Sequence, residues 1–80
     1  MRRIPLESST LASVLYLPKS RELEVEFRSG QIYRYRNVPP HSYHELMAAR
    51  SKGAYYNFNI RNHFSFQQLG QSLSAKTGAV

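Results

Sequence analysis

The chain has 80 residues, enough for one domain with a thin core and little room for an enclosed active site. Its 11 Lys and Arg residues outnumber 5 Asp and Glu residues, and the resulting net charge of +6 favours a polyanionic partner. Cys is absent, which excludes a disulfide framework and a thiolate nucleophile and favours a cytoplasmic location. No apolar run is long enough for a signal peptide or a membrane span, so no membrane partner is expected.

The first half of the chain predicts three antiparallel strands. Residues 11–17 form a short apolar run typical of a buried strand, and residues 22–28 alternate between apolar and charged side chains. A three-residue loop over 28–30 would place Gly30 in the left-handed conformation that such loops need, and residues 31–37 return as the third strand. This register pairs Leu23 with Tyr35 and Val25 with Tyr33 on an apolar face, and Glu24 with Arg34 and Glu22 with Arg36 on the other.

The second half of the chain predicts helices. Pro39 and Pro40 begin a helix with apolar residues at amphipathic spacing, and Gly53 is expected to end it. Residues 54–62 fit either a strand or a second helix, and residues 64–69 suggest an extended segment that packs back. We therefore expect an α+β fold, a three-stranded antiparallel β-meander with two helices packed on one face. Residues 1–69 would form this single domain, and residues 70–80, which lack periodicity, would form a disordered, flexible tail.

Several short motifs follow one another in a defined order between Ser8 and Leu69. They are Ser8-Ser9, Leu23-x-Val25-x-Phe27, Ser29-Gly30, Tyr33-Arg34-Tyr35, Val38-Pro39 and Ser51-Lys52-Gly53-x-Tyr55-Tyr56-Asn57-x-x-Ile60-Arg61. The ordered set resembles the KTSC domain, which is named for the C-terminus of certain lysyl-tRNA synthetases and also occurs in stand-alone bacterial or phage proteins. The resemblance to the stand-alone form implies a helical conformation for residues 51–62 and, more loosely, RNA binding.

One strand carries aromatic and basic residues in alternation. Tyr33 and Tyr35 share a strand face, where aromatic rings can stack on bases while Arg34 and Arg36 meet phosphate groups. The same register also fits two core tyrosines whose hydroxyls lie at the edge of the core. In that interpretation the two arginines form the exposed pair.

A second candidate is the Ser51-Lys52-Gly53 segment. A glycine, a lysine and a following helix start can together grip a phosphate, and Arg61 would extend the patch. The same residues also fit a plain helix corner in which Ser51 caps the second helix. Asn57 can contact a base or satisfy turn backbone.

We expect a small binding module without catalysis that takes tRNA or single-stranded RNA on a basic and aromatic surface. The residues expected to form this surface are Arg34, Arg36, Arg50, Lys52, Arg61, Tyr33, Tyr35, Tyr55 and Asn57. The alternative is a protein-interaction or self-associating module with an acidic partner, because five aromatic residues over 55–66 are many for so short a chain to bury. A monomer or a weak homodimer fits either hypothesis.

Catalysis and metal binding have little support. Asp is absent, so a Ser-His-Asp triad cannot form. Three of the five acidic residues lie on one strand beside arginines, which keep carboxylates ionised rather than poised as general acids. His41, His44 and His63 lack Cys or Asp partners, so no metal site and no cofactor are expected.

Overall fold

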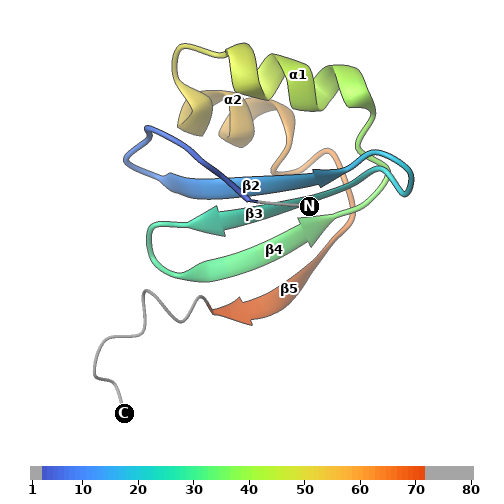
Figure 1. Cartoon of the computed structure of the whole chain (residues 1–80), viewed down its shortest axis with the longest axis horizontal. Helices are drawn as coiled ribbons and strands as arrows, with labels where there is room; N and C mark the ends of the chain where they lie inside the picture. Colours follow the sequence, from blue (N-terminus) through green and yellow to red (C-terminus); the bar gives the residue numbers. More distant parts are fainter. Residues whose placement is uncertain (1–2, 72–80) are drawn as a thin grey trace.

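The computed structural model describes residues 3–71, which form one antiparallel sheet and two helices (Figure 1). The strands are β1 (Ile4–Pro5), β2 (Leu11–Leu17), β3 (Glu22–Phe27), β4 (Gln31–Tyr35) and β5 (Phe66–Gln71). The helices α1 (Pro40–Ala48) and α2 (Lys52–Asn59) connect β4 to β5. The sheet order β1-β2-β3-β4-β5 follows the chain, so each strand pairs with its neighbours in sequence.

The expectation of three strands was wrong, because the sheet has five. A two-residue strand pairs with β2 at one edge, and β5 pairs antiparallel with β4 at the other edge. Two residues are too few to show alternation, and β5 is rich in Gln and pairs with an irregular register, so neither strand has a clear period of two. β5 continues through Gly70 and Gln71, while residues 72–80 lie outside the described residues and leave the expected tail untested.

The predicted hairpin register is confirmed. Gly30 has a φ of 101°, and its N–H donates to the carbonyl of Phe27 at 2.8 Å, which closes the turn. The register places Leu23 opposite Tyr35, Glu24 opposite Arg34 and Val25 opposite Tyr33.

One predicted charge pair is not formed. Arg36 lies beyond the end of β4, and its guanidinium donates to Gln67 Oε1 at 3.0 Å instead of pairing with Glu22. Glu22 has its ion pair with Arg34, at 3.9 Å. The prediction failed because β4 ends one residue earlier than the register assumed and β5 lies beside it.

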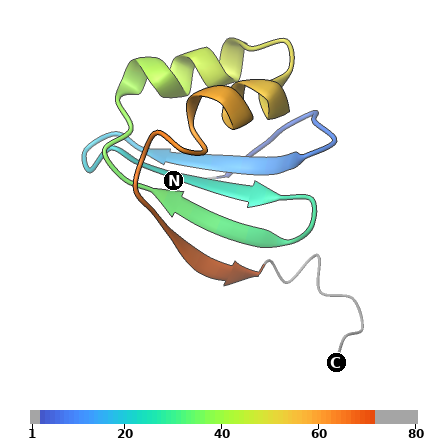
Figure 2. The ribbon, with the colours of Figure 1, turned by 180° about the vertical axis from the view of Figure 1, so that it is seen from behind.

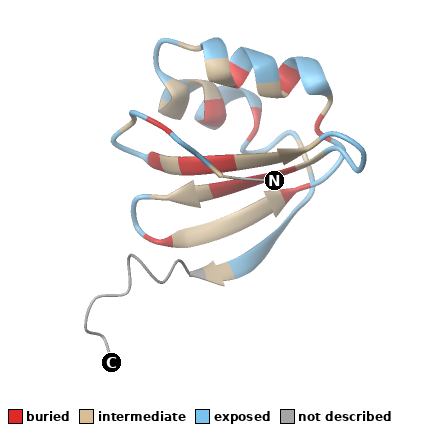
Figure 3. Cartoon of the chain, viewed as in Figure 1, coloured by how far each residue is buried: buried red, intermediate tan, exposed pale blue. Residues whose placement is uncertain are grey.

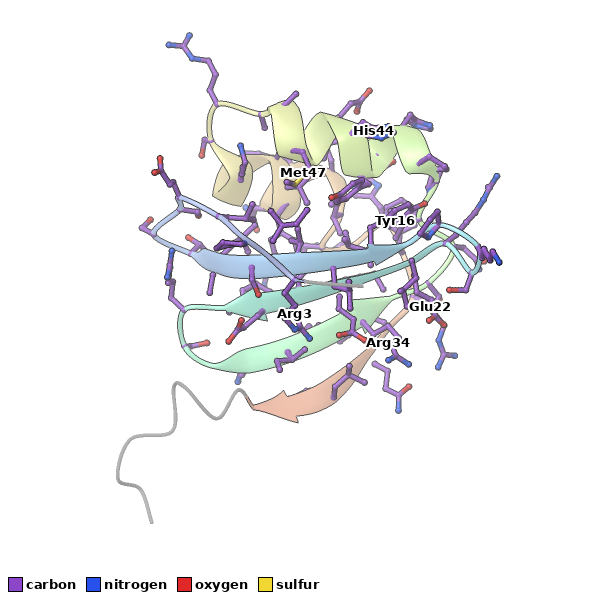
Figure 4. All side chains as sticks on the ribbon, in the orientation of Figure 1. Arg3, Tyr16, Glu22, Arg34, His44 and Met47 are labelled. Atoms are coloured by element: carbon purple, nitrogen blue, oxygen red, sulfur yellow. The ribbon has the colours of Figure 1, made fainter. Side chains whose placement is uncertain are left out.

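Both helices pack on the sheet face that carries the apolar side of the hairpin. Tyr16 of β2 stacks on Tyr43 of α1 with ring centroids 4.7 Å apart, and Tyr56 of α2 packs edge-on against Tyr35 of β4. Figure 4 shows Tyr16 and Met47 between α1 and the sheet, with His44 on the outer side of the helix. Figure 3 shows buried stretches, in red, on β2, β3 and both helices. The buried core consists of Leu6, Leu11, Val14, Leu23, Val25, Tyr35, Val38, Leu46, Tyr56 and Ile60.

The first helix does not end at Gly53, contrary to expectation. α1 ends at Ala48, and Gly53 lies in the first turn of α2, whose helical conformation agrees with the resemblance. Gly53 instead allows a neighbouring segment to approach the helix closely. A Cβ at position 53 would lie 3.2 Å from Thr10 Oγ1, so the turn before β2 packs directly on this helix.

Candidate nucleic-acid interface

A groove of about 770 Å³ lies between α2 and the β4–β5 side of the sheet. Its walls come from α2, the turn that follows α2, the β3–β4 turn, β4 and the first residue of β5. The groove exists because the helices lie towards the β2 side of the sheet and leave β5 at the far side, as Figures 1 and 2 show from opposite directions. Its volume falls within the range of about 300–1,000 Å³ that is usual for small-ligand sites.

Aromatic rings form much of the groove surface. Tyr33 and Phe66 are stacked, with ring centroids 5.1 Å apart and ring planes 7° apart, because the β4–β5 pairing brings them to the same face. Phe66 is 52% exposed, and Phe58 on the α2 side is 72% exposed. Exposed aromatic residues that gather in one groove are typical of a binding surface.

Two tyrosines close the floor of the groove. Tyr35 is fully buried, Tyr56 is 7% exposed, and their hydroxyls hydrogen bond to each other. Burial raises the pKa of Tyr35 far above its ordinary value and also raises the pKa of Tyr56. Both phenols therefore stay neutral at physiological pH, and the floor carries no negative charge.

Arg61 supplies a positive charge to the groove. Its Nη1 donates to Asn57 Oδ1 at 3.0 Å, a contact across one helical turn that orients the guanidinium. Within residues 3–71 the guanidinium of Arg61 has one hydrogen-bond partner, Asn57, so its other N–H donors are available to a ligand. Burial is the main cause of the raised pKa of Tyr35 and of Tyr56, and the charge of Arg61, which lines the same groove, opposes that rise.

The acidic residues of β3 do not reach the groove, and none of the residues that line it is acidic. Glu24 points to the opposite sheet face, where its carboxylate accepts from Arg3 Nη2 at 2.6 Å and from Arg34 Nη2 at 2.7 Å. Figure 4 shows Arg3, Glu22 and Arg34 together over the middle strands. The sheet thus separates a face of paired charges from a groove with uncompensated positive charge.

The Ser51-Lys52-Gly53 segment borders a different hollow, of about 220 Å³, beside residues 7–10. Lys52 Nζ donates to the carbonyl of Ala49 at 3.0 Å, and Ser51 Oγ accepts from the N–H of Ala54 at 3.2 Å as the cap of α2. These contacts favour the helix-corner interpretation over the phosphate grip, because the polar groups of the segment satisfy one another.

The nine predicted site residues therefore divide among four places. Tyr33, Tyr35, Asn57 and Arg61 line the groove. Arg34 on β4 and Arg36 just beyond its end lie away from it, Arg50 and Lys52 border the smaller hollow, and Tyr55 lies between the helices. The hydroxyl of Tyr55 donates to Glu45 Oε1 at 2.6 Å, and burial followed by this hydrogen bond raises the pKa of Tyr55 to about 12.

The groove also contains Phe58 and Phe66, which the predicted site did not include. Both belong to the aromatic segment that suggested an interaction surface, so their residue type was a usable signal. The place of Phe66 beside Tyr33 was not predictable, because it depends on the pairing of β4 with β5.

Metal and membrane features can be checked over residues 3–71. No three His, Asp or Glu side chains of this part gather as metal ligands. His41 and His44 are exposed on α1, and His63 Nε2 lies 3.1 Å from the carbonyl of Phe58. Neither helix in the described part is long and apolar enough to cross a bilayer.

The fold and the groove define a small α+β domain with an open aromatic and basic site. The KTSC domain family matches residues 7–64, and the chain belongs to that family, as its motifs indicated. In the crystal structure of a KTSC domain protein from Yersinia pestis the same fold is found, with a TM-score of 0.84 and 35% sequence identity. That similarity covers 86% of this chain and 97% of the Yersinia protein.

Two kinds of relatives share this domain. An uncharacterized protein of Stutzerimonas stutzeri is 47% identical over 57 residues, which cover 71% of this chain and 80% of that protein. Lysine–tRNA ligase of Nostoc punctiforme is 40% identical over 63 residues, which cover 79% of this chain and 11% of the ligase. The similarity to the ligase is therefore confined to a short segment of that enzyme.

Proposed function

We propose that the chain is a small, non-enzymatic module that binds RNA in the groove between α2 and β4–β5. The observation that carries the proposal is the composition of the groove, which combines exposed aromatic rings with Arg61 and amide side chains and has no acidic lining residue. Aromatic platforms with basic side chains are the usual means of binding RNA strands. The relatives named as lysine–tRNA ligases, which by that name act on tRNA, support the same ligand class.

Charge separation supports this choice of surface. The formal net charge of +6 attracts any polyanion, but Arg3 and Arg34 are paired with Glu24 on the opposite face of the sheet, and Lys52 borders the smaller hollow rather than the groove. Arg61 keeps unused donors and lies in the groove. We therefore assign the phosphate contact to Arg61, the one Lys or Arg among the described residues that line the groove. We also propose a cytoplasmic location, which the lack of Cys in so small a domain favours.

The test is fluorescence anisotropy of labelled tRNA and of a single-stranded RNA at several salt concentrations, with heparin as the control polyanion. Arg61→Ala is expected to reduce the slope of log K against log salt by about 0.7, the contribution of one phosphate contact to a single strand. Lys19→Ala is the matched control. It removes the same charge from the exposed β2–β3 turn, where Lys19 does not line the groove, and should leave the slope unchanged. If Arg61→Ala and Lys19→Ala gave the same slope, or if neither RNA bound the chain at low salt, the proposal would be refuted.

A second candidate is a protein-interaction module, which the exposure of Phe58 and Phe66 also favours. Its partner would be an acidic protein or a second copy of the chain. Sedimentation at increasing protein concentration tests self-association. A monomer at all concentrations would exclude the second copy, and failure of Phe58→Ser to dissociate a dimer would exclude this surface as its interface.

A further inference from the structure

We propose that the groove binds unpaired nucleotides by stacking bases on Phe58 and Phe66, and that it discriminates against duplex RNA. The inference rests on the proposed function and names the form of RNA that the groove accepts. The two rings lie on different walls of the same groove, one on α2 and one on β5, and they are its most exposed aromatic residues.

Phe66 is a prepared stacking surface. Its ring is stacked on Tyr33 and also contacts Tyr35, with centroids 5.4 Å apart. Tyr33 in turn packs edge-on against Phe27 at 5.5 Å between centroids. A ring that is already fixed loses little freedom when a ligand arrives, so more of the contact energy appears as affinity. Base stacking on such rings tolerates any base, since every base has a π face.

Amide side chains supply contacts to base edges. Gln31, Asn57 and Asn62 line the groove, and an amide offers both a donor and an acceptor to the edge of a base. The side-chain oxygen of Asn57 accepts a hydrogen bond from Arg61, so the NH₂ group of Asn57 remains available to a ligand. Aromatic rings, amides and one guanidinium match a nucleotide better than an acidic peptide, which would use Arg61 alone.

The size and shape of the groove oppose a duplex. A volume of about 770 Å³ suits a ligand of the size of one or two nucleotides. Bases in a duplex are stacked on their neighbours and cannot reach rings inside such a groove, whereas bases of loops and single strands can be splayed out. Arg61, which lines the same groove, would then meet the phosphate that joins the bound bases.

The experiment uses the full chain and a short RNA that contains 2-aminopurine, a base whose fluorescence is quenched by stacking. The RNA is offered as a single strand and as the same sequence in a perfect duplex. The variants are Phe58→Ala and Phe66→Ala, with Ile4→Ala as the matched control, because Ile4 is 41% exposed and does not line the groove. Phe58 is 72% exposed, so its replacement should leave the fold intact even if that of Phe66 weakens β5.

We expect tighter binding of the single strand, quenching on binding, and a Kd about 5- to 150-fold higher for each phenylalanine variant, the usual effect of losing one base stack. Ile4→Ala should change neither Kd nor quenching. Equal binding of strand and duplex without quenching, with Phe58→Ala silent, would overturn the stacking inference and leave RNA binding in place. Failure of both RNAs to bind would overturn the proposed function as well. Equal weakening by Ile4→Ala would refute the assignment to the groove.

Discussion

The hydrogen bond between the Tyr35 and Tyr56 hydroxyls should be the strongest energetic coupling at the groove floor. Replacing either tyrosine with Phe keeps the ring and removes one hydroxyl, which leaves the other hydroxyl without its partner. An unpaired buried polar group costs about 1–3 kcal/mol, whereas removing both partners from a site of the same shape is close to neutral.

The structure predicts unequal effects for the two single substitutions. Tyr56→Phe leaves the hydroxyl of Tyr35, which is fully buried, so we expect a loss of about 2–3 kcal/mol in the free energy of unfolding. Tyr35→Phe leaves the hydroxyl of Tyr56 without its partner. Because Tyr56 as a residue is 7% exposed and lines the groove, the expected loss is smaller, about 1 kcal/mol. The double variant should lose less than about 1 kcal/mol, which gives a coupling energy of at least about 2 kcal/mol.

Urea unfolding of the four proteins, followed by circular dichroism, measures this coupling as a double-mutant cycle. The matched control combines Tyr35→Phe with Tyr55→Phe, because the hydroxyl of Tyr55 bonds to Glu45 and shares no partner with Tyr35. That pair should be additive. If the Tyr35 and Tyr56 substitutions were also additive, the two hydroxyls would not be mutual partners and the described floor of the groove would be wrong.

Two further predictions concern pH and the hairpin. Burial raises the pKa of Tyr35 above the unfolded value of about 10 and the pKa of Tyr55 to about 12, so the unfolded chain releases these protons first. The free energy of unfolding should therefore keep its full value below about pH 10 and decline above it by up to about 1.4 kcal/mol per pH unit for each such tyrosine. Denaturation at each pH, with tyrosinate absorbance to follow ionisation, measures this decline, and a constant free energy from about pH 9 to about pH 12 would contradict it. Gly30→Ala should destabilise the chain by about 1–2 kcal/mol in thermal unfolding, because φ is 101° there. Gly53→Ala should cost less, because the preference of Ala for a helix offsets the 3.2 Å approach of the added Cβ to Thr10 Oγ1, and equal losses would argue against the described turn.

The central hairpin could be predicted because its determinants are local. Alternation over residues 22–28 identified the apolar face, and Gly30 identified the loop, so the pairing of Val25 with Tyr33 followed from neighbours close in the chain. The second helix was ambiguous from its period and became predictable through the motif of the family. Arg36 was misassigned because its partner, Gln67, lies 31 residues further along the chain.

The candidate site could be predicted only in part. Tyr33, Tyr35, Asn57 and Arg61 belong to the groove, but the expected surface also included cations that lie elsewhere, such as Arg34, which pairs with Glu24, and Lys52, which borders the smaller hollow. The sequence does not show whether a basic side chain is paired with an acidic one. That depends on which side chains the folded chain brings within hydrogen-bond distance.

By itself the sequence determined the α+β class, the register of the hairpin, the family and the surplus of positive charge, since each depends on residue types, local spacing or composition. The tertiary structure decided that β5 extends the sheet, that Phe66 stacks on Tyr33, and that Arg61 stays available beside them. The physical reason is that the groove forms where helix α2 and strand β5 meet β4, and contacts between segments so distant in the chain leave no period or motif that local reasoning can detect.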